Sequence, residues 1–300
     1  MRQWLFGTSA VLALMTGAVP CQAAFVLGTA ADYGVLVEPN AASFQLNNST
    51  IFANVGLGTG VSPIQIASNG FIKAVPAFPA PLTGRLDLVD SSATISNPGN
   101  VDGGVHFNQA QVTTALNTVN TLNSTLGAEA GTPLTISGGG QLVNASAGTL
   151  DPFGNRVFSL TSGSYNNNNQ GFTVVGSAAD YAVFNIANGT SNEAIGGPIS
   201  LSGGITSDHV LFNFVGTSGN LGGSAGGATV NGIFLAPQMK INIDNITING
   251  RLFGGRAGQD FQTVSGFFLN QPGIIPEPAS VLLLAFGGLG ALGIRRPRIR

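Results

Sequence analysis

The chain has 300 residues, of which only 8% are charged and 43% are hydrophobic. Typical soluble domains carry about 25% charged residues, whereas disordered chains lack apolar residues and carry a high net charge. This composition excludes a disordered chain and predicts a folded one whose surface consists of Asn, Ser, Thr, Gln and Gly. The body contains no run of basic residues, so we expect no nucleic-acid partner.

The first 23 residues follow the three-part pattern of a secretory signal peptide. Arg2 is followed by an uncharged apolar run, and small residues then precede a cleavage site between Ala23 and Ala24. A transmembrane anchor and, through Cys21, a lipoprotein are the alternatives, but the short apolar run with its small-residue exit favours cleavage. Cys21 is the only cysteine, so cleavage leaves a mature chain without a disulfide.

The C-terminal segment, residues 271–300, combines a proline motif, an apolar stretch and a basic cluster. The motif Pro276-Glu277-Pro278 precedes the apolar residues 279–294, which as a helix would cover roughly 24 Å at about 1.5 Å per residue. The basic cluster consists of Arg295, Arg296, Arg298 and Arg300. Because a cluster of arginines keeps its end of a membrane segment in the cytoplasm, we expect a transmembrane segment with the preceding body outside.

This order of features resembles the PEP-CTERM sorting signal. The resemblance implies processing by an exosortase, an intramembrane enzyme found usually in Gram-negative bacteria that make exopolysaccharide. It also implies that the precursor is anchored transiently in the inner membrane and that the product reaches the cell surface or the extracellular space. An ordinary C-terminal anchor is the alternative.

The body, residues 24–270, shows the alternation of apolar and polar residues that is typical of half-buried strands. Alternation runs through Ile51–Leu57 and Ile241–Ile248, and in the second segment it slips at Asp244-Asn245, which predicts a turn or bulge. Further strands are expected at Phe172–Val175, Tyr181–Ile186, Val210–Val215 and Thr229–Leu235. Turns are expected at Asn188-Gly189, Gly203-Gly204 and Gly222-Gly223.

One segment predicts a helix instead. Residues 107–126 contain neither Gly nor Pro. Apolar residues recur there at spacings of three and four, at Val112, Ala115, Leu116, Val119, Leu122 and Leu126. We expect a helix over Asn108–Leu126, with Asn108 as its N-cap and Gly127 as its stop. The opposite face is Thr and Asn without basic residues, which favours a helix packed on a sheet over a membrane-active one.

Several segments of the body resemble bacterial ice-binding-protein-like β-solenoids. Leu27–Val37 is similar to their opening strand and Asn54–Gly58 to their next coil, while Leu211–Gly216 and Gly232–Pro237 resemble late coils. The late segments also resemble the choice-of-anchor A surface proteins. The resemblance implies a mainly β chain, folded as an irregular right-handed β-solenoid with one helix packed alongside. Lys73–Gly104 departs from the pattern and is expected to be an inserted loop or a cap.

The few ionisable residues of the body form no recognisable catalytic set. His106 and His209 lack the spacing of metal ligands; we expect the first at the start of the helix and the second at a strand edge. Asp87 and Asp90 are close in the sequence and could form the carboxylate pair of a glycosidase, while Asp244 lies between Lys240 and Arg251. Solvated charge pairs are the more ordinary expectation in so uncharged a protein.

Two glycine-rich stretches have equally ordinary interpretations. Gly56–Gly60 lacks the remainder of a phosphate-binding loop and is interpreted as a turn. Gly254–Phe261 is similar to one copy of a secreted calcium-binding repeat, but such sites need stacked copies. The sequence therefore predicts no catalytic residue, no metal and no cofactor.

These observations predict an exported cell-surface or extracellular-matrix protein with a structural or adhesive role, associated with exopolysaccharide. Neutral hydroxyl and amide side chains can form hydrogen bonds with carbohydrate. One alternative is an ice-binding protein, which needs one flat, regular, fairly apolar face of Thr, Ala or Ser; the sequence shows no ordered ladder of threonines. The other alternative is a polysaccharide-degrading enzyme.

The proline motif generates a direct test of sorting. In a host with an active exosortase, we expect cleavage beside Pro276-Glu277-Pro278 to remove the apolar segment and the arginines. Replacing Pro276 and Pro278 with Ala should block processing, because the helix could then extend through the recognition site. Mass spectrometry of the mature C-terminus checks this, and a mature form ending in Arg300 would show a simple anchor.

Overall fold

The computed structural model describes residues 25–272 apart from 76–81, 138, 162, 166 and 168–169. The predicted signal peptide with Ala23 and Ala24 lies outside the described residues. So do the motif Pro276-Glu277-Pro278, the apolar segment 279–294 and the arginines Arg295, Arg296, Arg298 and Arg300. Of the helices among the described residues, none combines the length and hydropathy that a membrane crossing requires.

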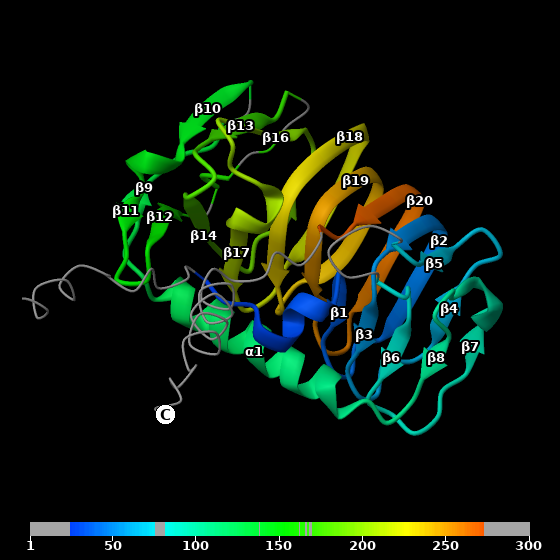
Figure 1. Cartoon of the computed structure of the whole chain (residues 1–300). Helices are drawn as coiled ribbons and strands as arrows, with labels where there is room; N and C mark the ends of the chain where they lie inside the picture. Colours follow the sequence, from blue (N-terminus) through cyan, green and yellow to red (C-terminus); the bar gives the residue numbers. More distant parts are fainter. Residues whose placement is uncertain are drawn as a thin grey trace, which may run out of the picture.

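The described residues form a three-sided coil in which strands of successive turns pair side by side (Figure 1). All strand pairs between coils are parallel, and each side of the coil is a ladder of strands in register. The short strand β11 (Thr149–Leu150) is different, because it pairs antiparallel with β12. The predicted mainly β solenoid is therefore confirmed.

The first ladder begins with β9 (Thr132–Pro133), β12 (Asn155–Leu160), β14 (Tyr181–Gly189), β17 (Val210–Gly216) and the ends of β18 (Asn220–Ala236) and β19 (Lys240–Gly254). It continues with β1 (Val35–Val37), β3 (Val55–Leu57), β6 (Leu86–Leu88) and β8 (Val105–His106).

The second ladder consists of β15 (Glu193–Ala194), the starts of β18, β19, β20 (Asp260–Asn270) and β2 (Ser43–Phe52), then β4 (Ile64–Ile66) and β7 (Ile95–Ser96). The third consists of β10 (Gln141–Asn144), β13 (Phe172–Val175), β16 (Ile199–Ser202), the middle parts of β18 and β19, the ends of β20 and β2, and β5 (Phe71–Lys73).

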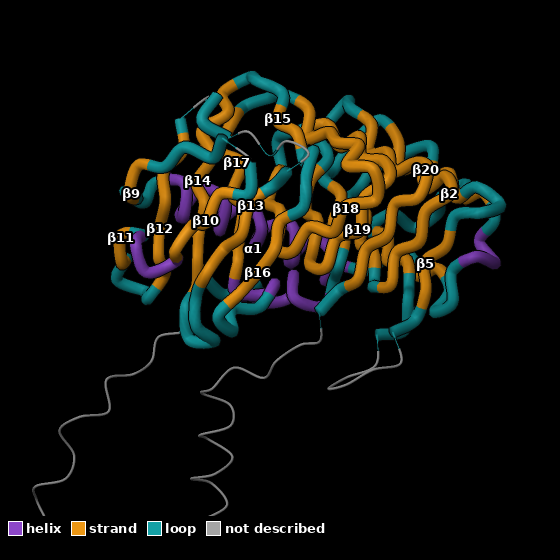
Figure 2. Tube along the Cα trace, turned by 90° about the horizontal axis from the view of Figure 1, so that it is seen from above, coloured by secondary structure: helices purple, strands orange, loops and turns teal. Residues whose placement is uncertain are grey.

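The order of coils in space differs from their order in the sequence. The last coils of the chain stack on the first one, because β19 pairs with β1 (Leu252 opposite Val35) and β20 pairs with β2 (Asp260 opposite Ser43). The helix α1 (Ala110–Gly127) then runs along the first ladder and connects the end of the stack at β8 with the end at β9 (Figure 1). Figure 2 shows the helix along one side of the stacked strands.

The core lies inside the coil, where the same side-chain position repeats from strand to strand. Phe158, Phe184, Phe212 and Phe234 form one stack, with neighbouring ring centroids 5.1, 5.0 and 5.1 Å apart. Such a stack follows from parallel strands in register, which place equivalent residues directly above one another. Offset aromatic pairs at this distance add stabilisation to the area that they bury.

The helix covers apolar residues that point outward from the first ladder. Its buried residues Val112, Ala115, Leu116, Val119 and Leu126 pack against Leu36, Val183, Leu211, Ile233 and Phe253, which confirms the predicted helix on a sheet. The prediction of Asn108 as N-cap was wrong: Asn108 has a φ of 58°, and Gln109 occupies the N-cap position. The helix ends at Gly127, where a Cβ atom would lie 2.9 Å from the Val215 side chain.

Two buried asparagines of the first ladder, Asn185 and Asn213, fasten the C-terminal half of the helix. Asn123 Nδ2 donates to Asn213 Oδ1 (2.6 Å), and Asn213 Nδ2 donates to Asn123 O (3.0 Å) and to Asn185 Oδ1 (2.9 Å). Asn185 Nδ2 in turn donates to Leu126 O. These bonds use carbonyl groups of the last helical turns, which have few partners within the helix itself.

Other predicted boundaries shift where the coil turns a corner. Ile51 and Val55 point inward as predicted, but β2 ends at Phe52 and β3 begins at Val55, so the expected strand is two strands on different sides. The slip at Asp244-Asn245 is confirmed: the register shifts there, and Asn245 has a φ of 48°. This is the corner between the second and third ladders.

Of the three predicted turns, one is confirmed and two lie within strands. The turn at Gly203-Gly204 is confirmed, but Gly222-Gly223 lies inside β18, where a Cβ on Gly223 would meet Ile195 O at 2.2 Å. Asn188-Gly189 forms the irregular end of β14. Of the two expectations for Lys73–Gly104, the inserted loop is wrong and the cap agrees with the structure, because β6 and β7 in this stretch continue two of the ladders at one end of the stack.

A buried carboxyl group beneath the helix makes stability depend on pH. Glu38 is 8% exposed, and both of its carboxylate oxygens accept hydrogen bonds from Asn120 Nδ2 (3.0 and 3.2 Å). Burial raises the pKa of Glu38 from 4.5 to about 7, against the opposing effect of the Asn120 bond. Between these two pH values, therefore, Glu38 is protonated in the folded state and ionised in the unfolded state.

We expect the free energy of unfolding to fall as pH rises from 4.5 to 7, by up to about 3 kcal/mol from this group. Glu38→Gln keeps an acceptor for Asn120 and removes the charge, so it should raise Tm at pH 8 and change it little at pH 4.5. Thermal unfolding at both pH values, with Glu129→Gln as the control, checks this. An equal effect of Glu38→Gln at both pH values would contradict it.

Candidate functional site

The outward side chains of the third ladder form two columns across five neighbouring strands. Val230, Ile248 and Leu269 point into the core, so the residues beside them point outward. One column consists of Thr229, Thr247, Phe268, Thr50 and Phe71, and the other of Asn231, Asn249, Asn270, Phe52 and Lys73. We call these ten residues the Thr/Asn face, on strands β18, β19, β20, β2 and β5 (Figure 1).

The backbone sets the spacing of this face. Neighbouring strands lie about 4.8 Å apart, and alternate residues along a strand lie about 6.6 Å apart. Thr229 is directly opposite Thr247, and Asn231 is directly opposite Asn249. The result is a two-dimensional array of hydroxyl, methyl and amide groups at regular intervals.

Hydrogen bonds between neighbouring amides fix the asparagine column. Asn270 Nδ2 donates to Asn249 Oδ1 (2.9 Å), Asn249 Nδ2 donates to Asn231 Oδ1 (3.2 Å), and Asn231 Nδ2 donates to Ile199 O (2.6 Å). Each amide is thus held in one orientation by the next strand. A ligand that binds here meets groups whose conformational entropy is already reduced.

The other end of the face is aromatic. Phe268 is 43% exposed, and Phe52 and Phe71 are half-buried. Lys73 Nζ lies 4.9 Å from the centre of the Phe71 ring and 3.0 Å from Asp102 Oδ1. The only charged member of the Thr/Asn face is therefore neutralised by an adjacent carboxylate.

The sequence contains a short repeat that indicates part of this face, although the threonines of the chain show no ordered ladder. Thr229-Val230-Asn231-Gly232 returns as Thr247-Ile248-Asn249-Gly250, and 18 residues separate the paired asparagines. This is one full coil. The third ladder then continues through β20 to Thr50 on β2. The pairing of β20 with β2 joins opposite ends of the chain, so no local repeat indicates it.

The second ladder offers a less uniform surface. Its outward amides include Asn242, Gln262 and Gln45, and Gln262 Nε2 donates to Gln45 Oε1 (3.0 Å). Beside them lie Lys240 and Asp260, whose charged atoms are 3.5 Å apart. Longer side chains and charges make this face more flexible and more strongly hydrated than the Thr/Asn face.

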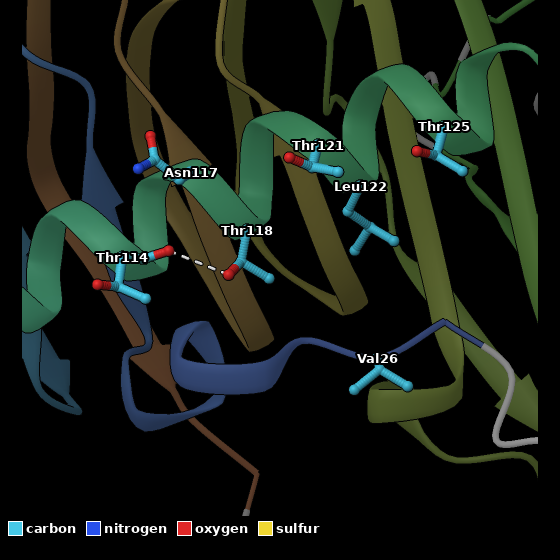
Figure 3. A pocket seen from close by; sticks show the side chains of 7 residues that line it. All are labelled: Val26, Thr114, Asn117, Thr118, Thr121, Leu122 and Thr125. Carbon is cyan, nitrogen blue, oxygen red and sulfur yellow. Dashed lines mark hydrogen bonds between the residues drawn. The ribbon is translucent and has the colours of Figure 1, made fainter.

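A shallow groove runs along the outer side of α1 (Figure 3). It is lined by Val26, Thr114, Asn117, Thr118, Thr121, Leu122 and Thr125. The four threonines follow one another along the helix, and Thr118 Oγ1 donates back to Thr114 O (3.0 Å). They form a single row on a curved surface, in contrast to the two columns of the Thr/Asn face.

The structure overturns the expectation that Asp87 belongs to a solvated pair. Asp87 is fully buried on β6. Its Oδ2 accepts hydrogen bonds from Arg85 Nε (2.7 Å), Tyr33 Oη (2.8 Å) and Gln111 Nε2 (3.2 Å), and its Oδ1 lies 3.4 Å from His106 Nδ1. Gln111 is in the first turn of α1, so this cluster fastens the start of the helix to the solenoid.

Asp90 and Asp244, the other two carboxylates singled out in the sequence, have no catalytic partner among the contacts that hold them. Asp90 accepts hydrogen bonds from Thr59 Oγ1 (2.6 Å) and Gly60 N (2.8 Å) and so holds a turn. Gly56, the first residue of the predicted Gly56–Gly60 turn, lies in β3 instead. Asp244 is not held between two cations, because Lys240 pairs with Asp260 and Arg251 is buried and donates to Ala31 O.

The histidines occupy the expected places. His106 ends β8 just before the helix, and His209 precedes β17 with its ring stacked on Tyr181 at 3.9 Å. Over the described part of the chain, no cluster of three or more His, Cys, Asp or Glu side chains could hold a metal ion.

We expect Asp87→Ala to lower the free energy of unfolding by about 3–5 kcal/mol, because it leaves Arg85 and the buried Tyr33 hydroxyl without their acceptor. Asp244→Ala, at a half-exposed position, should change it by less than about 0.5 kcal/mol. Urea denaturation followed by circular dichroism measures both. Equal effects of the two substitutions would show that the Asp87 cluster does not hold the helix.

The fold is similar to that of several solved ice-binding proteins. A glycosylated ice-binding protein from an Arctic yeast superposes with a TM-score of 0.54 at 20% identity, covering 84% of this chain and 95% of that one. The ice-binding protein of the Antarctic ascomycete Antarctomyces psychrotrophicus gives 0.51 at 18%, covering 84% and 100%. A domain of a Shewanella frigidimarina ice-binding protein gives 0.51 at 14%, covering 84% and 98%.

At these identities the likeness concerns the fold alone. No curated protein sequence matches the chain. The family of ice-binding-like adhesive domains, in contrast, has a sequence model that matches residues 23–262. Because this match covers most of the chain, the protein belongs to the family of ice-binding-like adhesive domains.

Proposed function

We propose that this chain is an exported adhesin whose Thr/Asn face binds ice. The observation that carries the proposal is the pair of in-register columns with Thr229 opposite Thr247 and Asn231 opposite Asn249. Membership of an ice-binding-like adhesive family and the shared fold of the yeast, ascomycete and Shewanella ice-binding proteins support it.

The physical basis is a match between regular side chains and ordered water. Threonine presents a hydroxyl group to water and a methyl group beside it, and the paired strands repeat this at about 4.8 Å. Charged groups bind their own hydration shells and would disturb such a layer; here the one cation, Lys73, is paired with Asp102. Many weak contacts made together by one rigid surface add up to firm adhesion.

Export and sorting place the face outside the cell in this proposal. The signal peptide and the Pro276-Glu277-Pro278 segment deliver the body across the inner membrane, and exosortase processing passes it to the cell surface or beyond. We propose a binding role without catalysis. In support, the carboxylates Asp87 and Asp90 are each engaged in structural hydrogen bonds.

A second candidate function is association with exopolysaccharide in the surface matrix. The observation that favours it is the aromatic half of the same face, where Phe268 is 43% exposed beside Thr50 and Asn270. Bulky rings interrupt a flat array suited to ice, yet rings flanked by hydroxyl and amide groups suit carbohydrate.

We expect Thr247→Tyr to reduce ice binding by about ten-fold, equivalent to about 1.4 kcal/mol, because the larger side chain lifts the ligand off its neighbours. Thr121→Tyr, on the helix groove, is the matched control and should have no effect. Ice-recrystallisation inhibition and thermal hysteresis measure the outcome, with Tm confirming the fold. Loss on Thr121→Tyr alone would assign the activity to the helix, and an inactive parent protein would refute the proposal.

A further inference from the structure

The aromatic half of the Thr/Asn face has a chequered pattern that the threonine half lacks. Across β20, β2 and β5, one column reads Phe268, Thr50, Phe71 and the other reads Asn270, Phe52, Lys73. Each phenylalanine therefore has a polar residue directly beside it on the next strand, and the rings lie on diagonals. Diagonal neighbours of this kind lie within reach of large side chains. We call these six residues the aromatic end.

Packing does not require rings at these positions. Thr247 on β19 occupies the same column position as Phe268 on β20, and both point away from the core. The core of this region is filled by Ile248, Leu269 and Ile51 from the alternate positions. Phe268 stays 43% exposed after folding, and covering this remaining surface with a ligand would remove apolar area from water.

The electrostatics of the aromatic end favour a neutral ligand. Lys73 is its only ionisable member and is paired with Asp102 at 3.0 Å. The ammonium of Lys73, with the backbone N–H of Ala74, also holds the pKa of Asp102 below its usual range. A polyanion would have to displace an existing carboxylate partner, while an uncharged ligand leaves the pair intact.

We propose that the aromatic end is a subsite for the hexopyranose rings of a neutral polysaccharide. The C–H face of a pyranose carries slight positive charge and packs on the negative face of an aromatic ring. Its rim hydroxyl groups then reach hydrogen-bonding groups on the neighbouring strands, namely the Thr50 hydroxyl and the Asn270 amide. The subsite rests on the second candidate function and gives it a location and a ligand class.

The test compares binding to uncharged and acidic glycans. The full mature protein is assayed by pull-down on amorphous cellulose and by affinity electrophoresis in dextran, with alginate as the acidic glycan. We expect retention by a neutral glycan and about ten-fold weaker binding for Phe268→Ala and for Phe52→Ala. Phe153→Ala is the matched control, because Phe153 is 44% exposed but lies in the turn before β12; it should bind like the parent.

The remaining outcomes separate this subsite from ice binding and from other partners. If Phe268→Ala loses glycan binding but keeps ice activity, the result supports a subsite distinct from the ice-binding surface. This conclusion does not depend on the effect of Thr247→Tyr, which tests ice binding alone. No retention on either neutral glycan, stronger binding to alginate, or equal binding by Phe268→Ala and Phe153→Ala would overturn it. So would a dimer in sedimentation velocity that Phe268→Ala dissociates, which would make a second copy of the chain the occupant.

Discussion

The parallel pairing between the last coils and the first coil is the contact on which the remainder of the structure depends. β20 pairs with β2 along nearly its whole length, and β19 pairs with β1. No covalent connection joins these coils directly. Backbone hydrogen bonds and the continuous apolar interior therefore hold the two ends of the chain together, and this junction lies in the middle of the Thr/Asn face. Thr247 and Thr50 share one surface only because β20 joins their strands.

The helix determines which side of the solenoid remains available for binding. Apolar side chains such as Leu211 and Phe253 point outward from the first ladder and would be exposed without α1. Two polar clusters, one around Asp87 and one between Asn123 and Asn213, hold the helix along this ladder. Displacing the helix would leave the buried polar groups of both clusters without their partners, so the clusters fix how the helix lies. The second ladder carries charges, so the third is left as the neutral, regular side.

That third side combines two chemistries on one rigid frame. On β18 and β19 it presents small hydroxyl and amide groups, whereas on β20, β2 and β5 phenylalanines alternate with Thr50, Asn270 and Lys73 at the equivalent positions. Because backbone spacing is the same throughout, the difference between the two halves lies in side chains alone. A surface of this kind is consistent with adhesion, in which one face engages an extended material through many weak contacts.

The sequence by itself determined the local features: the alternation of strands, the helical stripe from Val112 to Leu126 and the slip at Asp244-Asn245. Each depends on residues close together in the chain, so periodicity is sufficient to find it. Only the tertiary structure decided that Asp87 is buried beneath the helix and that Thr229, Thr247 and Thr50 lie on one face. Gln262 and Gln45, 217 residues apart, are hydrogen-bonded neighbours for the same reason. Stacking of coils brings together residues one coil or nearly a whole chain apart. The repeat of Thr229–Gly232 at Thr247–Gly250 indicates two consecutive coils, but no local pattern shows that the last coils stack on the first.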